Sequence, residues 1–328
     1  MGFYIGLDLG GTNIKAGLVD ETPNVLASAS VPTPLEGGPD SVISVMSDLA
    51  WRVAAEAKLG MEEVSCIGIG SPGPLDFKNG VVLALPNLQG WQNVPLRDRT
   101  SAKTGRPVVL ENDANAAAFG EFWAGAGRDP SIRHMIMLTL GTGIGSGLII
   151  DGRIVHGGFG LGGEGGHLIV EPNGRLCGCG QHGCLESYAS ARNTALRAEA
   201  ALAAGEPSSL RQVGKSGSGQ ISAKDVFDAA KIGDLLARRI VQETAKYLAI
   251  GCVSLCRVLD PQMIVFAGGM TLAGDYLFDM VTAEFQKRTW SITKDQVQVV
   301  PARLGNDAGF IGAAAVAWNS HQHQLIGP

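Results

Sequence analysis

The sequence predicts an α/β fold with two related halves and a cleft between them. Strand-like apolar runs alternate along the chain with segments whose apolar residues recur at helical spacing, which is typical of α/β architecture. Each half begins with a strand, a glycine-threonine loop and a second strand; the loops are residues 10–12 and residues 141–143. Two similar halves favour a cleft at their junction, which is a common place for a small-molecule site.

Length, composition and charge exclude several classes of protein. The chain has 328 residues, 45% hydrophobic and 17% charged, so we expect a sizeable core. The formal net charge is −5 and no Lys/Arg cluster stands out, which argues against a nucleic-acid partner. No apolar run approaches the ~20 residues needed to cross a bilayer, and no signal-peptide pattern is visible. We therefore expect a cytoplasmic protein with reduced cysteines and no membrane partner.

The first half is expected to open with three strands and a helix. Short apolar runs bounded by Gly, Asp and Pro are typical of strands. In the expected helix 39–59, Val42, Met46 and Leu49 would share one face. The expected strands are residues 4–8, 14–19, 25–31, 67–69 and 107–110, and the expected helices are residues 39–59 and 114–123.

The second half is expected to begin with a strand–loop–strand unit and to alternate in the same way. Ser222 is a suitable N-cap, because its hydroxyl can accept a hydrogen bond from a free backbone N–H. Residues 205–219 are rich in Ser and Gly and should form a surface loop. The expected strands are residues 135–140, 148–150, 263–266 and 297–300, and the expected helices are residues 186–204, 223–259, 276–287 and 309–318.

Two glycine-containing loops could bring backbone N–H groups close to phosphate oxygens. The first, residues 8–12 (DLGGT), contains a hydroxyl, and Lys15 follows with a cation. Asp8 could reach a hydrated Mg²⁺; the alternative for this segment is an ordinary hairpin turn. The second, residues 141–147 (GTGIGSG), is not a dinucleotide-binding fingerprint, because Ser146 stands at the third glycine position and a strand follows.

A histidine and three cysteines form the most specific local pattern. His167, Cys177, Cys179 and Cys184 lie within 18 residues, so they could hold a tetrahedral zinc ion. Four protein ligands would make the zinc structural. The alternative is three unrelated buried cysteines, but the other three cysteines are scattered along the chain, which favours zinc. His182 is a rival fourth ligand.

Asp113 follows an expected strand and precedes an expected helix. On position alone, a helix N-cap is the simplest interpretation. Glu111 and Asn112 make the segment a polar cluster at a strand end, where α/β proteins usually place ligands. A carboxylate here could accept a proton from a substrate hydroxyl. Glu164 and Glu186 bracket the expected zinc site and could bind hydroxyls too, unless they are simply solvated.

The remaining cysteines and histidines are expected to be structural. Cys252 and Cys256 share a helix face and Cys66 lies in a strand, so core packing is expected for all three. The other histidines are interpreted as ordinary surface or loop residues: His134, His156, His321 and His323.

In combination, these motifs resemble the ROK family, which groups repressors, open reading frames and sugar kinases. The resemblance runs from Ile5 to about Gly312. It implies the actin-like ATPase (ribonuclease H-like) fold, ATP-dependent phosphorylation of a hexose with Mg²⁺, a structural Zn²⁺ and a homodimer. The motifs are residues 8–12 (DLGGT), 111–115 (ENDAN), 140–143 (LGTG), and Glu164, His167, Cys177, Cys179, Cys184 and Glu186.

The resemblance implies a role for each matching residue. Asp113 would be the general base, and Asp8 would be the acid on the Mg²⁺ side. The sugar would be bound by Gly73, Asn87, Asn112, Asp113, Glu164, His167 and Glu186. Zinc would be held by His167, Cys177, Cys179 and Cys184. The phosphates would face Gly10, Gly11, Thr12, Lys15, Thr142 and Gly143, and the adenosine would lie beside Gly268 and Gly269.

The resemblance also implies domain boundaries. A smaller α/β domain would consist of residues 1–113 and about 309–328. Residues 114–308 would form a larger one that contains the zinc segment, residues 164–186.

Two segments are most similar to the ROK-type glucokinases: residues 71–74 (SPGP) and 87–91 (NLQGW). Glucose is therefore the expected sugar, and N-acetylmannosamine, fructose or another hexose is the alternative. A non-catalytic sugar-sensing regulator is the alternative from another class. The family's repressors carry a helix-turn-helix domain before the DLGGT motif; because the motif here begins at Asp8, we expect no such domain and disfavour the repressor.

Overall fold

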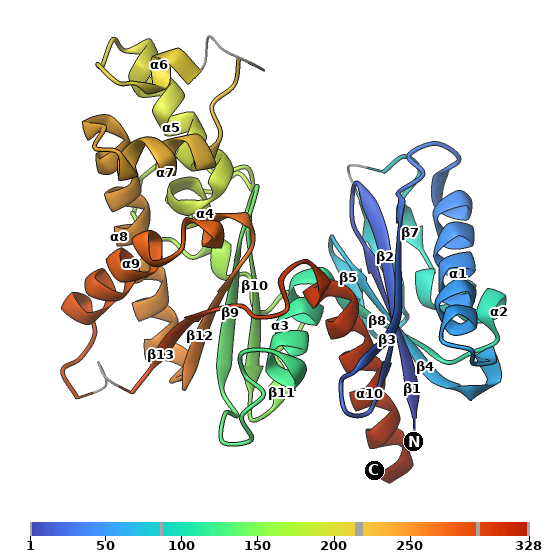
Figure 1. The fold of residues 1–328 in the computed structure, drawn as a ribbon. Helices are drawn as coiled ribbons and strands as arrows, with labels where there is room; N and C mark the ends of the chain where they lie inside the picture. The colour runs from blue at the N-terminus through green and yellow to red at the C-terminus, as the bar shows by residue number, and fades with distance from the viewer. Residues whose placement is uncertain (1, 86–87, 214–218, 293–295, 327–328) are drawn as a thin grey trace.

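The chain folds around two five-stranded sheets that stand side by side (Figure 1). The computed structural model describes residues 2–85, 88–213, 219–292 and 296–326. The strand orders are β3-β2-β1-β4-β8 and β11-β10-β9-β12-β13. In each sheet the first three strands pair antiparallel and the last two are added in parallel. The two halves therefore repeat one strand arrangement, as the sequence predicts.

The first half contains every strand and helix predicted for it, with ends shifted by a few residues. Those elements are β1 (Phe3–Leu9), β2 (Asn13–Asp20), β3 (Val25–Pro32), α1 (Gly38–Glu56), β4 (Val64–Ser71), β8 (Val108–Asn112) and α3 (Asp113–Ala124). The segment between β4 and β8 adds elements that were not predicted: β5 (Leu75–Asp76), β6 (Val81–Ala84), β7 (Gln92–Val94) and α2 (Leu96–Thr104).

The second half places its helices after the strand hairpin and around the last two strands. The strands are β9 (Met135–Leu140), β10 (Ile144–Ile150), β11 (Arg153–Ile154), β12 (Met263–Ala267) and β13 (Gln298–Pro301). The helices are α4 (Glu186–Ala189), α5 (Ala191–Ala203), α6 (Leu210–Val213), α7 (Ala223–Lys231), α8 (Leu235–Leu259), α9 (Asp275–Arg288) and α10 (Ala308–Ile326).

Two predicted continuous helices are each broken in two. Ser190 is extended, ends α4 and caps α5 by accepting a hydrogen bond from the Asn193 N–H. Likewise, α7 and α8 are separated at Gly233, and Asp234 caps α8. The Ser222 cap is confirmed, as its hydroxyl accepts from the Asp225 N–H.

Two loop predictions need correction as well. Strand β10 begins at Ile144, so the glycine loop before it is only residues 141–143. The predicted surface loop 205–219 contains the short helix α6; residues 214–218 lie outside the described residues.

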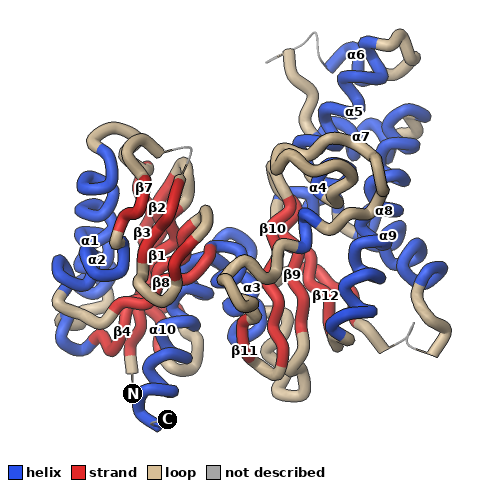
Figure 2. Tube along the Cα trace, turned by 180° about the vertical axis from the view of Figure 1, so that it is seen from behind, coloured by secondary structure: helices blue, strands red, loops and turns tan. Residues whose placement is uncertain are grey.

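Helices α3 and α10 lie between the two sheets, in both views of the molecule (Figures 1 and 2). Ala118 and Phe119 of α3 pack against the second sheet, and Ala314 and Ala317 of α10 pack against Tyr4 of the first. Helices α1 and α2 cover the outer face of the first sheet, and α4, α7, α8 and α9 lie on the outer side of the second, with α5 and α6 packed beyond them. This arrangement is the expected pair of α/β units; the domain boundaries at residues 113 and 309 stay predictions.

The helix layer approaches the first sheet so closely that only glycine fits between them. A Cβ on Gly6 would lie 1.7 Å from the Phe310 carbonyl oxygen, and one on Gly68 would lie 1.8 Å from that of Ala313. Such distances are far inside van der Waals contact. In the part of the chain that the structure describes, we find no helix long and apolar enough to cross a bilayer.

Candidate active site

Two cavities meet at the start of α3. The loop cavity, of about 530 Å³, lies against the glycine loop 141–143 and contains Asp8 and Glu186 in its lining. The Glu164 cavity, of about 470 Å³, lies on the other side and is lined by Glu164 and Asn112 among others. Asp113 belongs to the lining of both cavities. A group bound in one cavity would therefore face a group bound in the other across this carboxylate.

The Asp113 carboxylate is oriented by two donors. Its Oδ1 accepts hydrogen bonds from the Ala114 N–H at 2.8 Å and from Asn112 Nδ2 at 3.0 Å. Both bonds go to the same oxygen, so Oδ2 is left to accept from a ligand. Burial raises the pKa of Asp113, and these hydrogen bonds oppose that rise. The N-cap of α3 is Asn112 and not Asp113, since Asn112 Oδ1 accepts hydrogen bonds from the Ala114 and Asn115 N–H groups.

Asp8 lies at the other side of the loop cavity in a less compensated position. Burial and the charge of Asp113 raise the pKa of Asp8 to about 6, against the lowering effect of Lys15. Lys15 itself donates a hydrogen bond to the Asn306 carbonyl oxygen at 2.6 Å. Gly309, at the start of α10, leaves room for the Asp8 carboxylate, because a Cβ there would lie 2.3 Å from Oδ2. A carboxylate whose charge is disfavoured by burial and by a neighbouring acid is suited to a divalent cation.

The residues predicted to face the phosphates or the adenosine divide into two sets. Thr142, Gly143 and Gly268 line the loop cavity. Gly268 must be glycine, since its φ is 89° and a Cβ would lie 2.6 Å from the Leu140 carbonyl oxygen. The described lining of the loop cavity does not include the remaining ones: Gly10, Gly11, Thr12, Lys15 and Gly269.

The first loop closes as a hairpin turn, with the Gly10 N–H donating to the Asn13 carbonyl oxygen at 3.1 Å. Gly11 and Thr12 are exposed beyond it. The turn that the sequence left as an alternative is therefore present, and it leaves these two residues accessible to a ligand.

The predicted sugar-binding residues are mostly brought together. Gly73, Asn112, Asp113, Glu164 and His167 line the Glu164 cavity. Glu186 lies in the loop cavity instead, where its Oε2 accepts a hydrogen bond from the Ile144 N–H at 2.9 Å. Asn87 lies outside the described residues.

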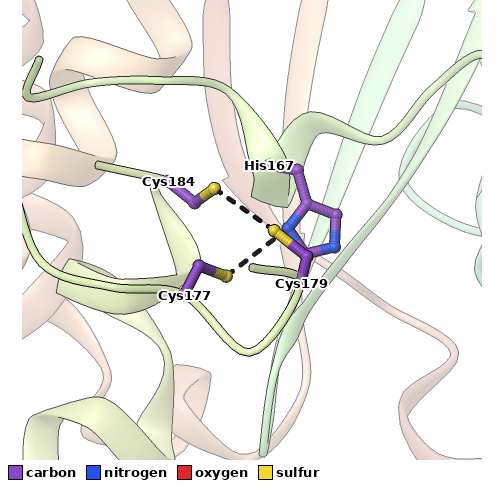
Figure 3. Close-up of side chains that lie close together, drawn as sticks. All are labelled: His167, Cys177, Cys179 and Cys184. Atoms are coloured by element: carbon purple, nitrogen blue, oxygen red, sulfur yellow. Dashed lines mark hydrogen bonds between the residues drawn. The ribbon is translucent and has the colours of Figure 1, made fainter. Parts of the chain in front are cut away.

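The four predicted zinc ligands converge on one point (Figure 3). His167 Nδ1 and the sulfurs of Cys177, Cys179 and Cys184 all lie within 4.8 Å of one another. Cys177 Sγ is 3.7 Å from His167 Nδ1, and Cys179 Sγ is 3.7 Å from Cys184 Sγ. Tetrahedral zinc with bonds of about 2.0–2.3 Å would hold its ligand atoms roughly 3.5–3.8 Å apart. The residues present therefore fit zinc.

The thiols of this cluster affect one another's pKa in the absence of a metal. Burial and the neighbouring thiols raise the pKa of the Cys184 thiol to about 12. A bound cation would reverse that effect, because it stabilises thiolates. His182 is excluded as the fourth ligand by position: its Nδ1 bonds the Gly174 carbonyl oxygen at 2.9 Å, and His167 takes the ligand place.

One pair near the site was missed by the sequence analysis. The Nε2 of His156 lies 2.7 Å from Oε2 of Glu111, a residue only 3% exposed. The interpretation of His156 as an ordinary loop residue is therefore wrong. The two residues are 45 positions apart, and no local pattern connects them.

The other three histidines have lesser roles. The half-buried His134 accepts a hydrogen bond from the Asp151 N–H, and His321 bonds the Tyr4 hydroxyl. The side chain of His323 lies outside the described part of the chain.

Comparison with known proteins identifies the family. A model of the ROK family matches residues 4–320. The chain belongs to the ROK family. This ROK protein is 39% identical over 313 residues to a glucokinase of Thermotoga maritima, an alignment that covers 95% of the chain and 96% of the relative.

Solved structures of ROK proteins have the same fold. A ROK hexokinase from Thermus thermophilus matches with a TM-score of 0.84 and 37% identity, over 98% of this chain and 99% of its own. A ROK glucokinase from Streptomyces griseus, in complex with glucose and AMPPNP, matches with a TM-score of 0.77 and 35% identity, over 97% and 100%. The predicted actin-like ATPase fold is thus confirmed.

Because the folded pKa of Asp8 is about 6, this residue should make stability depend on pH. A carboxyl group with a raised pKa binds its proton more tightly in the folded state, so the free energy of unfolding falls as pH rises toward 6. We expect Asp8→Asn to raise the free energy of unfolding by about 1–3 kcal/mol at pH 7.5. Urea unfolding without nucleotide or Mg²⁺ should show that this gain shrinks toward pH 4.5.

Asp20 provides a control of opposite sign. Burial raises the pKa of Asp20, but hydrogen bonds from Asn24 and Thr22 together bring it below its ordinary value. Asp20→Asn should therefore lose stability at pH 7.5. An Asp8→Asn variant that is also less stable at pH 7.5 would contradict the proposed repulsion.

Proposed function

We propose that this protein is an ATP-dependent hexokinase that converts glucose to glucose 6-phosphate. The observation that carries the proposal is the position of Asp113 between the two cavities, with one carboxylate oxygen oriented by donors and the other open. One cavity has the glycine loop suited to phosphates, and the other has polar groups suited to hydroxyls. The glucokinase relatives support glucose as the sugar.

In this mechanism the sugar occupies the Glu164 cavity. Asn112, Glu164 and His167 line it and offer hydrogen-bonding groups to the ring hydroxyls. ATP occupies the loop cavity, with its phosphates near Thr142 and Gly143 and its adenosine near Gly268. The two substrates then approach each other at Asp113, which makes the transfer effectively unimolecular.

Asp113 acts as the general base. Its Oδ2 accepts the proton of the sugar 6-hydroxyl as that oxygen bonds to the γ-phosphorus, and the bond from this phosphorus to the β,γ-bridging oxygen breaks to release ADP. Burial raises the pKa of Asp113 and makes it a stronger base than an exposed aspartate. The hydrogen bonds to Oδ1 keep the carboxylate in one orientation for this step.

Asp8 would hold Mg²⁺ beside the phosphates. The Asp8 carboxylate fits this role, since burial and Asp113 disfavour its charge and a cation would relieve both effects. When bound, Mg²⁺ neutralises charge on the phosphate oxygens.

His167, Cys177, Cys179 and Cys184 would hold a structural Zn²⁺. With four protein ligands, this ion has no open position for a substrate. It would join the segment that carries Glu164 and His167 to the start of α4, which carries Glu186. Its contribution is therefore to hold the sugar-binding side chains in place.

We also propose that the working form is a cytoplasmic homodimer, as the family resemblance implies. Light scattering of the purified protein tests the assembly, and a monomer at micromolar concentration would overturn it.

Replacing the base should separate chemistry from binding. We expect Asp113→Asn to lower kcat by at least about 10²–10⁴-fold, because a positioned base contributes about that much. Glucose binding, measured by calorimetry, should survive, since the amide keeps the shape of the side chain. A coupled assay of ADP release with Mg²⁺-ATP against a panel of hexoses and N-acetylhexosamines provides the rate.

Asp129→Asn, in an exposed loop, is the matched control and should leave turnover unchanged. Full activity in Asp113→Asn would remove Asp113 as the base. Turnover on a different sugar alone, such as N-acetylmannosamine or fructose, would keep the mechanism and change the substrate. If folded, zinc-loaded protein releases no ADP with any sugar, a non-catalytic sugar-sensing regulator would be favoured.

Removing the metal should destabilise the sugar side of the site. We expect about one zinc per chain by elemental analysis, and a lower Tm and weaker glucose binding after chelation, both restored by Zn²⁺. Cys184→Ser should lose the zinc. Cys66→Ala removes a buried thiol that does not belong to the cluster, so this variant should retain the zinc. Zinc-free wild-type protein with an unchanged Tm would contradict the assignment.

A further inference from the structure

Beside the active site, a histidine of one half of the molecule contacts a buried carboxylate of the other. Glu111 lies near the end of β8 in the first sheet, and His156 follows β11 of the second sheet. The Glu111 side chain is only 4% exposed and that of His156 is 37% exposed. A buried carboxylate requires partners, and His156 supplies one of them from the opposite half.

On its other oxygen, Glu111 organises the residues around the catalytic base. Its Oε1 accepts hydrogen bonds from the Asn112 N–H at 2.8 Å and from Asn115 Nδ2 at 3.0 Å. Asn112 in turn donates to Asp113 Oδ1. Glu111 therefore belongs to the framework of Asp113 without touching either cavity itself.

On the other side of the pair, His156 anchors a glycine-rich loop. Its carbonyl oxygen accepts a hydrogen bond from the Gly162 N–H at 2.8 Å, which closes residues 156–162 into a loop. The His156 ring packs against Phe77 with centroids 4.5 Å apart. Residues 160–164 line the Glu164 cavity directly after this closure. The His156 side chain thus fixes the base of the loop that forms one wall of the sugar cavity.

We propose that His156 is a positioning residue: paired as a cation with Glu111, it holds loop 156–162 over the Glu164 cavity and so sets the affinity for the sugar. The inference rests on the proposed hexokinase function. It assigns no chemical step to His156. It predicts that the affinity for the sugar depends on the charge of this side chain and not only on its shape.

The surroundings of His156 support a cation. The hydrogen bond that the His156 ring donates to Glu111 raises the pKa of His156, although burial lowers it. Among the described residues that line the adjoining hollow of about 480 Å³, the charged side chains are Asp76 and Lys78. The Asp76 carboxylate accepts hydrogen bonds from Asn79. As pH rises through the raised pKa, the ion pair becomes a neutral hydrogen bond, so sugar affinity should fall on the alkaline side.

The test compares steady-state kinetics of wild type, His156→Gln and His156→Arg from pH 6 to pH 8.5. We expect His156→Gln to raise the KM for the sugar about tenfold, with the KM for ATP within about twofold, because the loop wall is displaced and the nucleotide cavity is not. The alkaline fall in kcat/KM for the sugar should disappear in His156→Gln. His156→Arg keeps the charge at every pH, so it should keep a low KM with a flat profile.

His134→Gln, at a half-buried position outside the lining of both cavities, is the control and should behave as wild type. A sugar KM and pH profile in His156→Gln equal to those of wild type would overturn the inference. If His156→Gln fails to fold, as judged by zinc content and circular dichroism, the wild type and His156→Arg are compared instead. An equal alkaline fall in kcat/KM for the sugar in these two proteins would refute the inference. Wild-type protein inactive on every sugar would instead refute the proposed function, so the two failures are distinguishable.

Discussion

The whole arrangement depends on how closely α10 lies against the first sheet and α3. A Cβ on Gly312 would lie 1.8 Å from the Ala116 carbonyl oxygen, just as Gly6 and Gly68 meet α10 from the sheet side. This backbone-to-backbone packing fixes the starts of both central helices. Helix α10 begins against Asp8 and α3 begins at Asp113, so the same packing that unites the two halves brings two carboxylates into one cavity. The fold therefore builds charge repulsion into its centre.

Three buried or partly buried carboxylates near this centre are compensated in different ways. Glu121 accepts backbone N–H groups of Ala126, Arg303 and Leu304, which ties α3 to the segment before α10 and leaves no free oxygen for a ligand. Asp113 shares one oxygen between two donors and keeps the other free. Asp8 has the least compensation and therefore the pKa raised to about 6. The less a carboxylate is satisfied by the protein, the more it is available to a substrate or a cation.

Local signals in the sequence were enough for most strands, the zinc cluster and the position of Asp113, because each rests on neighbours in the chain. The breaks at Ser190 and Gly233 were missed, although a capping serine and a glycine mark them, because the apolar periodicity continues through both. Strands β5 to β7 are only two to four residues long and carry little pattern of their own. The partner of Glu111 could not be foreseen at all, since it lies 45 positions away and the contact exists only once the two halves pack together.

The segment from His156 to His167 shows why such long-range contacts are needed here. Most of its residues between 157 and 166 are glycines, which lose more conformational entropy on ordering than any other residue. The segment is nevertheless held at three places: by Glu111 at its start, by a hydrogen bond of the Ser146 hydroxyl to the Gly163 carbonyl in its middle, and by the cysteine cluster at His167. Glycine allows the backbone to pass close to Ile144, where a Cβ on Gly166 would lie 2.0 Å from a carbonyl oxygen. The anchors offset the entropy that this close approach costs, and Glu164 is positioned between them as a result.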